Sequence, residues 1–153
     1  TAGTAIFGAT LSTYTPPSAT VGTLFYYCIA TQDVSGCEVT SVTSEVEVNA
    51  GAQFSTQPIS DELCLGETTN ALVVAFTNGT GTPTYQWYSN TVDNNTTGTI
   101  IAGETATTYT PPNNPTGILY YYCVVSFPSG VGCNEITSNT ARIEIVNGIQ
   151  IRT

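Results

Sequence analysis

The side chains with the clearest chemical potential in this sequence are five cysteines: Cys28, Cys37, Cys64, Cys123 and Cys133. Cysteine thiols form disulfides in oxidising compartments, and as thiolates they bind zinc. Zinc is disfavoured here, because the sequence has no histidine and no pair of cysteines separated by two residues. We therefore expect disulfides. The last three cysteines allow three pairings, one of which, Cys123–Cys133, would link the last two expected strands across their hairpin.

Two residue types that carry much of enzyme chemistry are missing. The chain has no histidine and no lysine, and its only basic residues are Arg142 and Arg152. Without histidine there is no serine–histidine–aspartate arrangement, and without lysine there is no P-loop, Schiff base or lysine general base. Paired carboxylates remain available, so composition alone does not exclude a glycosidase. We nevertheless expect no catalytic residue and no cofactor, and so a protein that is not an enzyme.

The charge balance limits the partners. Two basic and eleven acidic residues give a formal net charge of -9 at pH 7. Nucleic acids and anionic membrane surfaces are bound through lysine and arginine, so we expect neither as a partner. No apolar run approaches the roughly 20 residues that cross a bilayer, so we expect no membrane insertion. The first residues lack the charged and apolar regions of a signal peptide, which indicates a processed protein or a piece of a longer one.

A group of carboxylates raises the question of calcium. Asp61, Glu62 and Glu67 lie within seven residues, and Asp93 lies in an asparagine-rich loop. A calcium site needs several convergent oxygen ligands, and the sequence has no D-x-D-x-D-G loop. We interpret these residues as a solvated acidic surface that keeps neighbouring repeats soluble, and we expect no metal site.

The elements that must position these side chains are expected to be β-strands. The 153 residues include 29 threonines and 9 tyrosines, besides many valines and isoleucines. Side chains branched at Cβ and flat rings suit the pleated, half-buried surface of a sheet. Hydrophobic residues make up 41% of the chain, which is enough for a packed core. The composition therefore predicts a folded all-β protein.

The sequence repeats itself. Thr-Tyr-Thr-Pro-Pro at residues 13–17 returns at 108–112, and Leu-Phe-Tyr-Tyr-Cys at 24–28 returns as Leu-Tyr-Tyr-Tyr-Cys at 119–123. These motifs return after 95 residues, and later ones, such as Glu-Val-Thr-Ser at 38–41 and Glu-Ile-Thr-Ser at 135–138, return after 97. The period is therefore about 97 residues, which is the size of one β-sandwich domain. We predict the C-terminal half of a repeat at 1–48, a complete repeat at 49–146 and the start of the next repeat at 147–153.

Within the complete repeat, short apolar segments alternate with turn residues at the spacing of a β-sandwich. We expect seven short strands and no helix. The strands are expected at residues 52–55, 71–76, 84–88, 99–102, 105–110 and 119–127, with a last strand ending at Val146.

Side chains along a strand alternate between two faces. The expected core contains Trp87, Tyr85, Tyr121, Leu72, Val74 and Phe76. The candidate surface-contact aromatics on the opposite face are Tyr88, Tyr120 and Tyr122. Exposed rings can stack on sugars or adhere to surfaces. The simpler interpretation, which we favour, is cross-strand packing that stabilises the sheet.

Several motifs, taken in order, resemble a known family. They are Cys64-Leu65-Gly66, Tyr-Gln-Trp-Tyr-Ser-Asn at 85–90, Thr-Tyr-Thr-Pro-Pro at 108–112, Tyr-Tyr-Tyr-Cys at 120–123, and Gly-Cys at 132–133 followed by Thr-Ser-Asn-Thr at 137–140. Together they resemble the tandem Ig-like repeats of giant Bacteroidetes cell-surface adhesins, such as those of flavobacterial gliding motility. Trp87 and the tyrosine two residues before Cys123 are also similar to an immunoglobulin core, although Val74 stands near the position of the usual partner cysteine.

The resemblance implies Ig-like antiparallel β-sandwich repeats, exported by type IX secretion and displayed on the cell surface. Their function would be structural and adhesive, in a long filament used in gliding motility and surface attachment. The implied partners are neighbouring repeats of the same chain, surface polysaccharide or substratum, and the gliding and secretion machinery. The alternative is a carbohydrate-binding or spacer module of a secreted polysaccharide-degrading enzyme, because similar modules occur there.

The resemblance also bears on the disulfide. Related modules with two cysteines keep positions like Cys64 and Cys133, which favours that pair over the hairpin pair. Cys28 and Cys37 occupy the hairpin positions in the half-repeat at 1–48. That half-repeat lacks the first three strands, so we expect its apolar faces to be uncovered.

Overall fold

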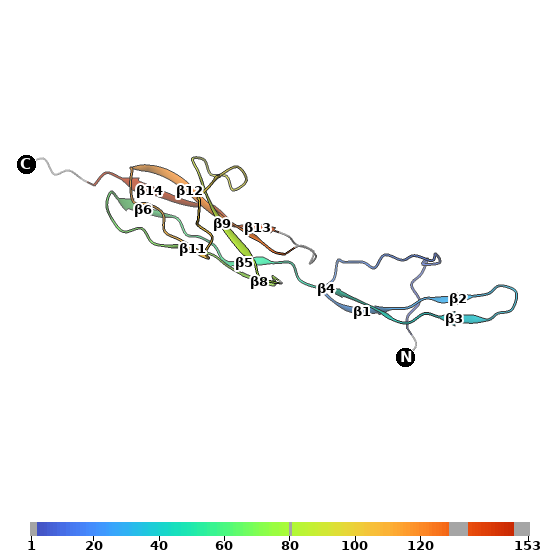
Figure 1. The fold of residues 1–153 in the computed structure, drawn as a ribbon. Helices are drawn as coiled ribbons and strands as arrows, with labels where there is room; N and C mark the ends of the chain where they lie inside the picture. The colour runs from blue at the N-terminus through green and yellow to red at the C-terminus, as the bar shows by residue number, and fades with distance from the viewer. Residues whose placement is uncertain (1–2, 80, 129–134, 149–153) are drawn as a thin grey trace, which may run out of the picture. The chain divides into compact units, whose positions relative to one another are not determined.

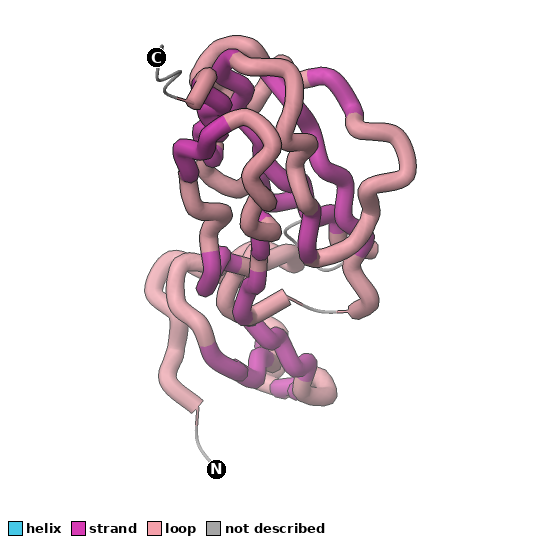
Figure 2. The backbone as a smooth tube through the Cα atoms, turned by 90° about the vertical axis from the view of Figure 1, so that its left-hand side faces the viewer, coloured by secondary structure: helices cyan, strands magenta, loops and turns pink. Residues whose placement is uncertain are grey.

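The computed structural model describes residues 3–79, 81–128 and 135–148 (Figure 1). The chain divides after Ala50 into two compact units, called the first and the second unit below. The described residues form strands, turns and loops, and no helix is drawn among them (Figure 2). Accordingly, no described segment is a helix long and apolar enough to span a membrane. The predicted all-β fold class is confirmed.

The first unit consists of two short antiparallel ladders. One pairs β1 with β4, and the other pairs β2 with β3. The bounds are Gly22–Tyr26 for β1, Ile29–Thr31 for β2, Glu38–Thr40 for β3 and Ser44–Val48 for β4. Only two residues separate β1 from β2, so the two ladders together make one interrupted hairpin.

The larger layer of the second unit is a six-stranded sheet with the strand order β10-β9-β12-β14-β6, and β13 also pairs with β12. All of its pairs are antiparallel except β14 with β6, which is parallel. The bounds are Asp61–Cys64 for β6, Thr84–Asn90 for β9, Thr99–Ile100 for β10, Gly117–Ser126 for β12, Glu135–Thr137 for β13 and Ala141–Val146 for β14.

The opposite layer of the second unit is built from two antiparallel ladders. In one, β5 pairs with β8, and in the other, β7 pairs with β11. The bounds are Gln53–Thr56 for β5, Leu72–Val73 for β7, Ala75–Thr77 for β8 and Thr108–Tyr109 for β11.

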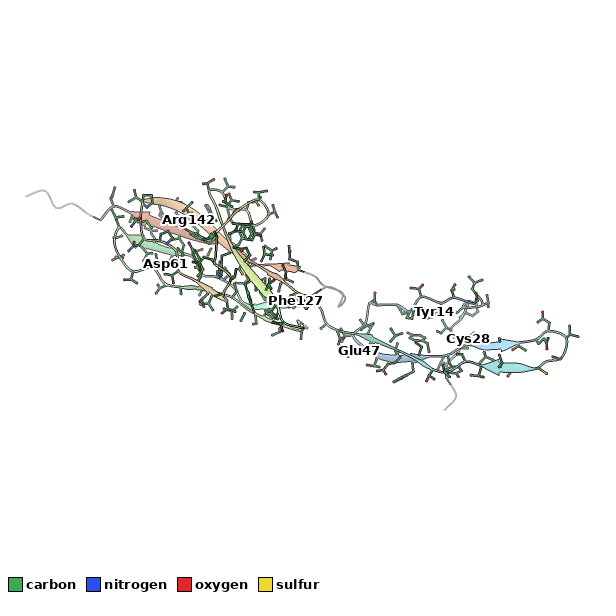
Figure 3. The ribbon with its side chains drawn as sticks, in the orientation of Figure 1. Tyr14, Cys28, Glu47, Asp61, Phe127 and Arg142 are labelled. Atoms are coloured by element: carbon green, nitrogen blue, oxygen red, sulfur yellow. The ribbon has the colours of Figure 1, made fainter. Side chains whose placement is uncertain are left out.

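A single apolar cluster joins the two layers. Trp87 in the middle of β9 is fully buried, and its indole N–H donates to the carbonyl oxygen of Ala106 at 2.9 Å. The predicted core residues Leu72, Val74 and Tyr121 are buried in the same cluster, while Phe76 and Tyr85 are partly buried against it. Side chains crowd between the layers around Phe127 (Figure 3). The second unit is therefore a β-sandwich.

Three elements differ from the sequence-based expectation. The single last strand expected to end at Val146 is divided into β13 and β14, which pair separately with β12. The single strand predicted at 71–76 is split at Val74, whose N–H donates to the carbonyl oxygen of Thr107 at 3.0 Å, so that β7 pairs with β11 and β8 with β5. The strand β6 was not predicted at all. Its residues Asp61 and Glu62 have poor intrinsic strand preference, and pairing with β14 outweighs that preference.

Strand pairing in the first unit follows the same register as in the second. The ladder of β1 with β4 begins with Gly22 opposite Val48, and the ladder of β12 with β14 begins with Gly117 opposite Ile145. These two pairs are related by the sequence offsets of 95 and 97 residues. The same offsets relate the β2–β3 ladder to the β12–β13 ladder.

Side-chain contacts repeat as well. The N–H of Gly3 donates to the Tyr27 hydroxyl at 2.9 Å, and the N–H of Gly98 donates to the Tyr122 hydroxyl at 2.9 Å. In both units a Cβ on the glycine would lie within 2.8 Å of that tyrosine ring, so the close approach requires glycine. The two units therefore share local packing as well as sequence.

The two units differ in how far their equivalent side chains are buried. Cys123 is fully buried, whereas its repeat equivalent Cys28 is exposed. Leu24 and Phe25 on β1 are about 60% exposed, at 58% and 62%. The predicted uncovered apolar faces of the half-repeat are thus present.

Candidate functional site

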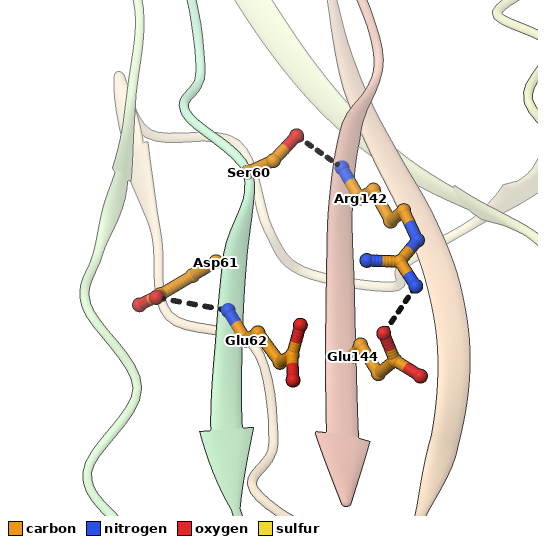
Figure 4. A network of polar contacts seen from close by, with 5 residues as sticks. All are labelled: Ser60, Asp61, Glu62, Arg142 and Glu144. Atoms are coloured by element: carbon orange, nitrogen blue, oxygen red, sulfur yellow. Dashed lines mark hydrogen bonds and ion pairs between the residues drawn. The ribbon is translucent and has the colours of Figure 1, made fainter.

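The feature that stands out in the second unit is the pairing of β6 with β14. The two strands lie side by side and point the same way (Figure 4). The register runs from Asp61 opposite Ile143 to Cys64 opposite Val146. Since β6 lies near the start of the unit and β14 is its last described strand, this pair ties the two ends of the sandwich together.

Hydrogen bonds close this pair at both ends. At the start, the backbone N–H of Arg142 donates to the Ser60 hydroxyl at 2.9 Å (Figure 4). At the far end, the backbone N–H of Leu65 donates to the carbonyl oxygen of Val146 at 2.8 Å. The attachment of β6 to β14 therefore extends beyond the four paired residues on each strand.

A tight turn follows β6 and holds its end. The N–H of Glu67 donates to the carbonyl oxygen of Cys64 at 3.0 Å, and the Glu67 carboxylate accepts from the Cys64 N–H at 2.7 Å. Gly66 has a φ of 88°, which places it at the third position of a type II turn. Leu65 occupies the second position, where proline is also favoured.

The charges on this strand pair are balanced locally. Glu62 lies directly opposite Glu144, an arrangement in which like charges repel. The Arg142 guanidinium forms an ion pair with Glu144 (Figure 4), and this hydrogen bond, followed by its electrostatic attraction, raises the pKa of Arg142 above its ordinary value. Glu62 adds a smaller attraction to the same guanidinium. Arg142 thus offsets the repulsion between the two glutamates.

The acidic residues near β6 accept hydrogen bonds from neighbouring groups of the protein. The two carboxylate oxygens of Asp61 accept hydrogen bonds from the Glu62 N–H and from the Asn70 amide, each at 3.0 Å. Among the described residues no cluster of three or more histidine, cysteine or carboxylate side chains is arranged to hold a metal ion. These carboxylates organise the strand and the turn that leads away from it.

The aromatic residues predicted on the outer face are only partly at the surface. Tyr88 and Tyr122 lie opposite each other on β9 and β12, and their rings stack at 5.0 Å between centroids with an interplanar angle of 4°. Tyr122 is only 2% exposed. The prediction that Tyr122 is an exposed surface-contact ring is wrong, because the loop that carries Gly98 covers it. Tyr88 and Tyr120 are half-buried.

The cysteines of the described residues are not joined to one another. Cys28, Cys37 and Cys64 are exposed, and Cys123 is buried. Cys133 lies outside the described residues, so the predicted Cys64–Cys133 and Cys123–Cys133 pairs both remain predictions. Burial raises the pKa of the Cys123 thiol to about 11, against a smaller lowering by a hydrogen bond to the backbone of Gln86. That thiol is therefore neutral and poorly reactive at neutral pH.

Sequence reasoning missed the residues that form the β6–β14 attachment, namely Ser60, Leu65 and the pairing role of Arg142. A signal was present, because three apolar residues, Leu63 to Leu65, follow a polar stretch and Gly66 marks a turn just after them. That signal is short and cannot reveal that the partner strand lies about 80 residues later and runs parallel.

The second unit also coincides with a recognised sequence family. Residues 55–147 match a family described as Domain of unknown function (DUF8696). The chain belongs to the DUF8696 family. The DUF8696 match begins inside β5 and includes every later strand of the second unit, the β6–β14 pair among them. A search of curated proteins finds no match to the chain.

Proposed function

We propose that this chain is a load-bearing and adhesive repeat module of a long cell-surface adhesin filament, used in gliding motility and surface attachment. The observation that carries the proposal is the parallel pairing of β6 with β14. In this proposal the second unit transmits force along the filament, the repeats follow one another as Ig-like sandwiches, and type IX secretion brings them to the cell surface. No residue has a catalytic role.

The mechanical argument follows from strand direction. Tension on a repeat pulls the start of β6 one way and the end of β14 the other way. Because the strands are parallel, that tension acts along both strands and loads their hydrogen bonds at the same time. An antiparallel hairpin pulled at its two open ends would instead lose its bonds one after another. The β6–β14 pair therefore resists extension along the direction in which a filament would be stretched.

Two further observations support a filament of repeats. The two units share strand register and the glycine–tyrosine contact at the repeat offset, as expected of modules that recur along one chain. The motifs that resemble surface adhesin repeats provide the link to attachment and gliding. Many weak contacts along one filament would act together through their high effective concentration.

Replacing Leu65 by proline tests the load-bearing role. Leu65→Pro removes the N–H that bonds Val146, while the turn accepts proline at this position. Losing one hydrogen bond of about 1 kcal/mol should shorten the lifetime of the folded second unit under constant tension by roughly fivefold. The readout is single-molecule force-clamp unfolding of the whole chain, held at its two ends.

Leu65→Ala is the matched control, since it keeps the N–H and shortens a side chain that is 49% exposed. We expect its lifetime under tension to equal that of the unaltered chain. An equal lifetime for Leu65→Pro would contradict the proposal, because the β6–β14 bonds would then not bear the load.

The carbohydrate-binding alternative is supported by the half-buried Tyr88 and Tyr120 on the outer face of the large sheet. With Tyr122 covered, this face offers two partly accessible rings instead of three. Titration of the chain with soluble xylan, laminarin and alginate tests the alternative. Saturable binding that disappears in Tyr88→Ser and Tyr120→Ser would favour a sugar-binding module over a purely mechanical one.

A further inference from the structure

The first unit contains an apolar hollow that its own residues leave open. The hollow has a volume of about 350 Å³. It is lined by residues 17, 20 and 21, which precede β1, and by residues of β1 and β4, among them Leu24, Tyr26, Val46 and Val48. Tyr26, Val46 and Val48 are all partly exposed. Such a surface on a pair of strands marks a site that another element covers in the stable state.

The second unit shows what covers the equivalent surface. The repeat equivalents of Tyr26, Val46 and Val48 belong to the sandwich core. They are Tyr121, Ile143 and Ile145, with exposed fractions of only 3%, 3% and 6%. That core is completed by four side chains that come from the first half of the repeat. They are Leu63, Leu72, Val74 and Trp87.

The backbone of the first unit also lacks a partner strand that the second unit has. In the second unit, β12 pairs with β14 on one edge and with β9 on the other, over Tyr120–Ser126. In the first unit, β1 pairs with β4 alone among the described residues. The N–H and C=O groups on the remaining edge of β1 and β2 therefore have no strand partner there. An open edge beside an open apolar face is a template for strand addition.

We propose that the first unit is an acceptor for the first half of a repeat, a segment of the type that runs from residue 51 to residue 95 of this chain. The inference rests on the repeat organisation in the proposed function. The incoming segment adds its β9-type strand along Phe25–Thr31, which places its tryptophan opposite Cys28, as Trp87 lies opposite Cys123. Its β6-type strand pairs with β4, so that its leucine lies opposite Val48, as Leu63 lies opposite Ile145.

The donor in this proposal is a first half that is joined covalently to the half-repeat, not one supplied by another copy of the chain. In the second unit, this first half runs without interruption into the second half, so closing the sandwich needs only a short connection. The first half in another copy of the chain is already committed to its own sandwich, where Trp87 is fully buried. Donation by a second copy would require that sandwich to open.

The proposal is tested by adding a copy of residues 51–95 directly before Thr1 of the whole chain. The readout is the alkylation rate of the Cys28 thiol under reducing conditions, followed by peptide mass mapping. In the unaltered chain Cys28 should react quickly and Cys123 slowly, because the first is exposed and the second is buried. In the extended chain we expect Cys28 to react at least about 100-fold more slowly than before.

Two variants of the extended chain serve as controls. Trp87→Asp in the added copy alone removes the ring opposite Cys28, and Val46→Asp places a charge in the hollow. Both should restore rapid alkylation of Cys28 while Cys123 stays protected, which shows that the second unit is still folded. Slow alkylation in either variant would mean that the protection comes from something other than this docking.

Two outcomes would overturn the proposal. One is rapid alkylation of Cys28 in the extended chain. The other is dimerisation of the unaltered chain in sedimentation experiments with Cys28 protected, which would make a second copy the occupant. Either result leaves the behaviour of the second unit under tension unaffected, so failure here is distinguishable from failure of the load-bearing function.

Discussion

Two buried side chains of β12 titrate far from their ordinary range. Burial, with a smaller contribution from the neighbouring Tyr109, raises the pKa of Tyr121 from 10.0 to about 12. Burial raises the pKa of Cys123 from 9.0 to about 11. Both groups are therefore held in their neutral forms by the folded state, and ionisation of either favours the unfolded chain.

The second unit should consequently lose stability in alkaline solution. The contribution of Cys123 is complete below pH 9 and is lost as the pH rises to about 11, and that of Tyr121 is lost between pH 10 and about 12. A shift of about two pKa units corresponds to about 2–3 kcal/mol for each group. Urea unfolding followed by fluorescence of the single tryptophan, under reducing conditions from pH 7 to 12, measures the change.

Cys123→Ala isolates the two contributions. In this variant the loss of stability should begin near pH 10 instead of pH 9. The remaining buried groups with raised pKa values are the tyrosines Tyr121 and Tyr109, whose ordinary pKa is 10.0. A stability of the unaltered chain that is flat from pH 8 to 11 would contradict the burial of Cys123.

Prediction at the residue scale succeeded where a two-residue period was enough. Alternation along the strand around Trp87 placed that ring in the core and Tyr88 on the other face. It failed for Tyr122, since alternation assigns a face but does not show whether a loop covers that face. The loop that ends at Gly98 is fixed by contacts distant in sequence, which no local pattern reveals.

At the scale of elements, one hydrogen-bond motif recurs in both units, directly after β3 in the first and directly after β13 in the second. The Ser138 hydroxyl accepts from the Cys123 N–H and donates to the Asn139 carbonyl oxygen, both at 2.9 Å. Ser41 makes the equivalent bonds with Cys28 and Val42. Because Ser138 is fully buried, its hydroxyl satisfies a backbone donor that water cannot reach.

Ser138→Ala should destabilise the second unit by about 1–3 kcal/mol, because the buried Cys123 N–H would lose its acceptor. Urea unfolding followed by tryptophan fluorescence measures this change. Ser126→Ala is the control, since this serine lies at a partly exposed position at the end of β12 and its hydroxyl makes one longer bond, of 3.4 Å, to Glu135. Equal effects of the two substitutions would contradict the role given to Ser138.

Most strands could be predicted from apolar alternation bounded by glycine and proline, as with β9 and β14. The strand β6 could not, because its four residues include two acids and its stability comes from β14, far along the chain. The break at Val74 also depends on tertiary structure, since the two halves of that apolar run pair with different strands. Local propensity does not carry such information.

At the scale of the whole molecule, the chain combines a closed sandwich with an unfinished one. The second unit has a full core, whereas the first repeats half of the pattern and leaves the equivalent residues open. The repeat was readable from the sequence, because identical or closely similar motifs return in the same order at offsets of 95 to 97 residues. The Ig-like relationship and the disulfide pairing remain predictions, the latter because Cys133 lies outside the described residues.

The measurement that tests the load-bearing claim most directly is constant-velocity stretching of single chains held at both ends. If the β6–β14 pair bears the load, the second unit should resist until that pair fails and then unfold in one event. About 85 residues lie between the start of β6 and the end of β14. At up to ~3.6 Å per residue, the event should lengthen the chain by roughly 300 Å, less the length of the folded sandwich. Gradual extension without a force peak, or several small steps in its place, would contradict the account.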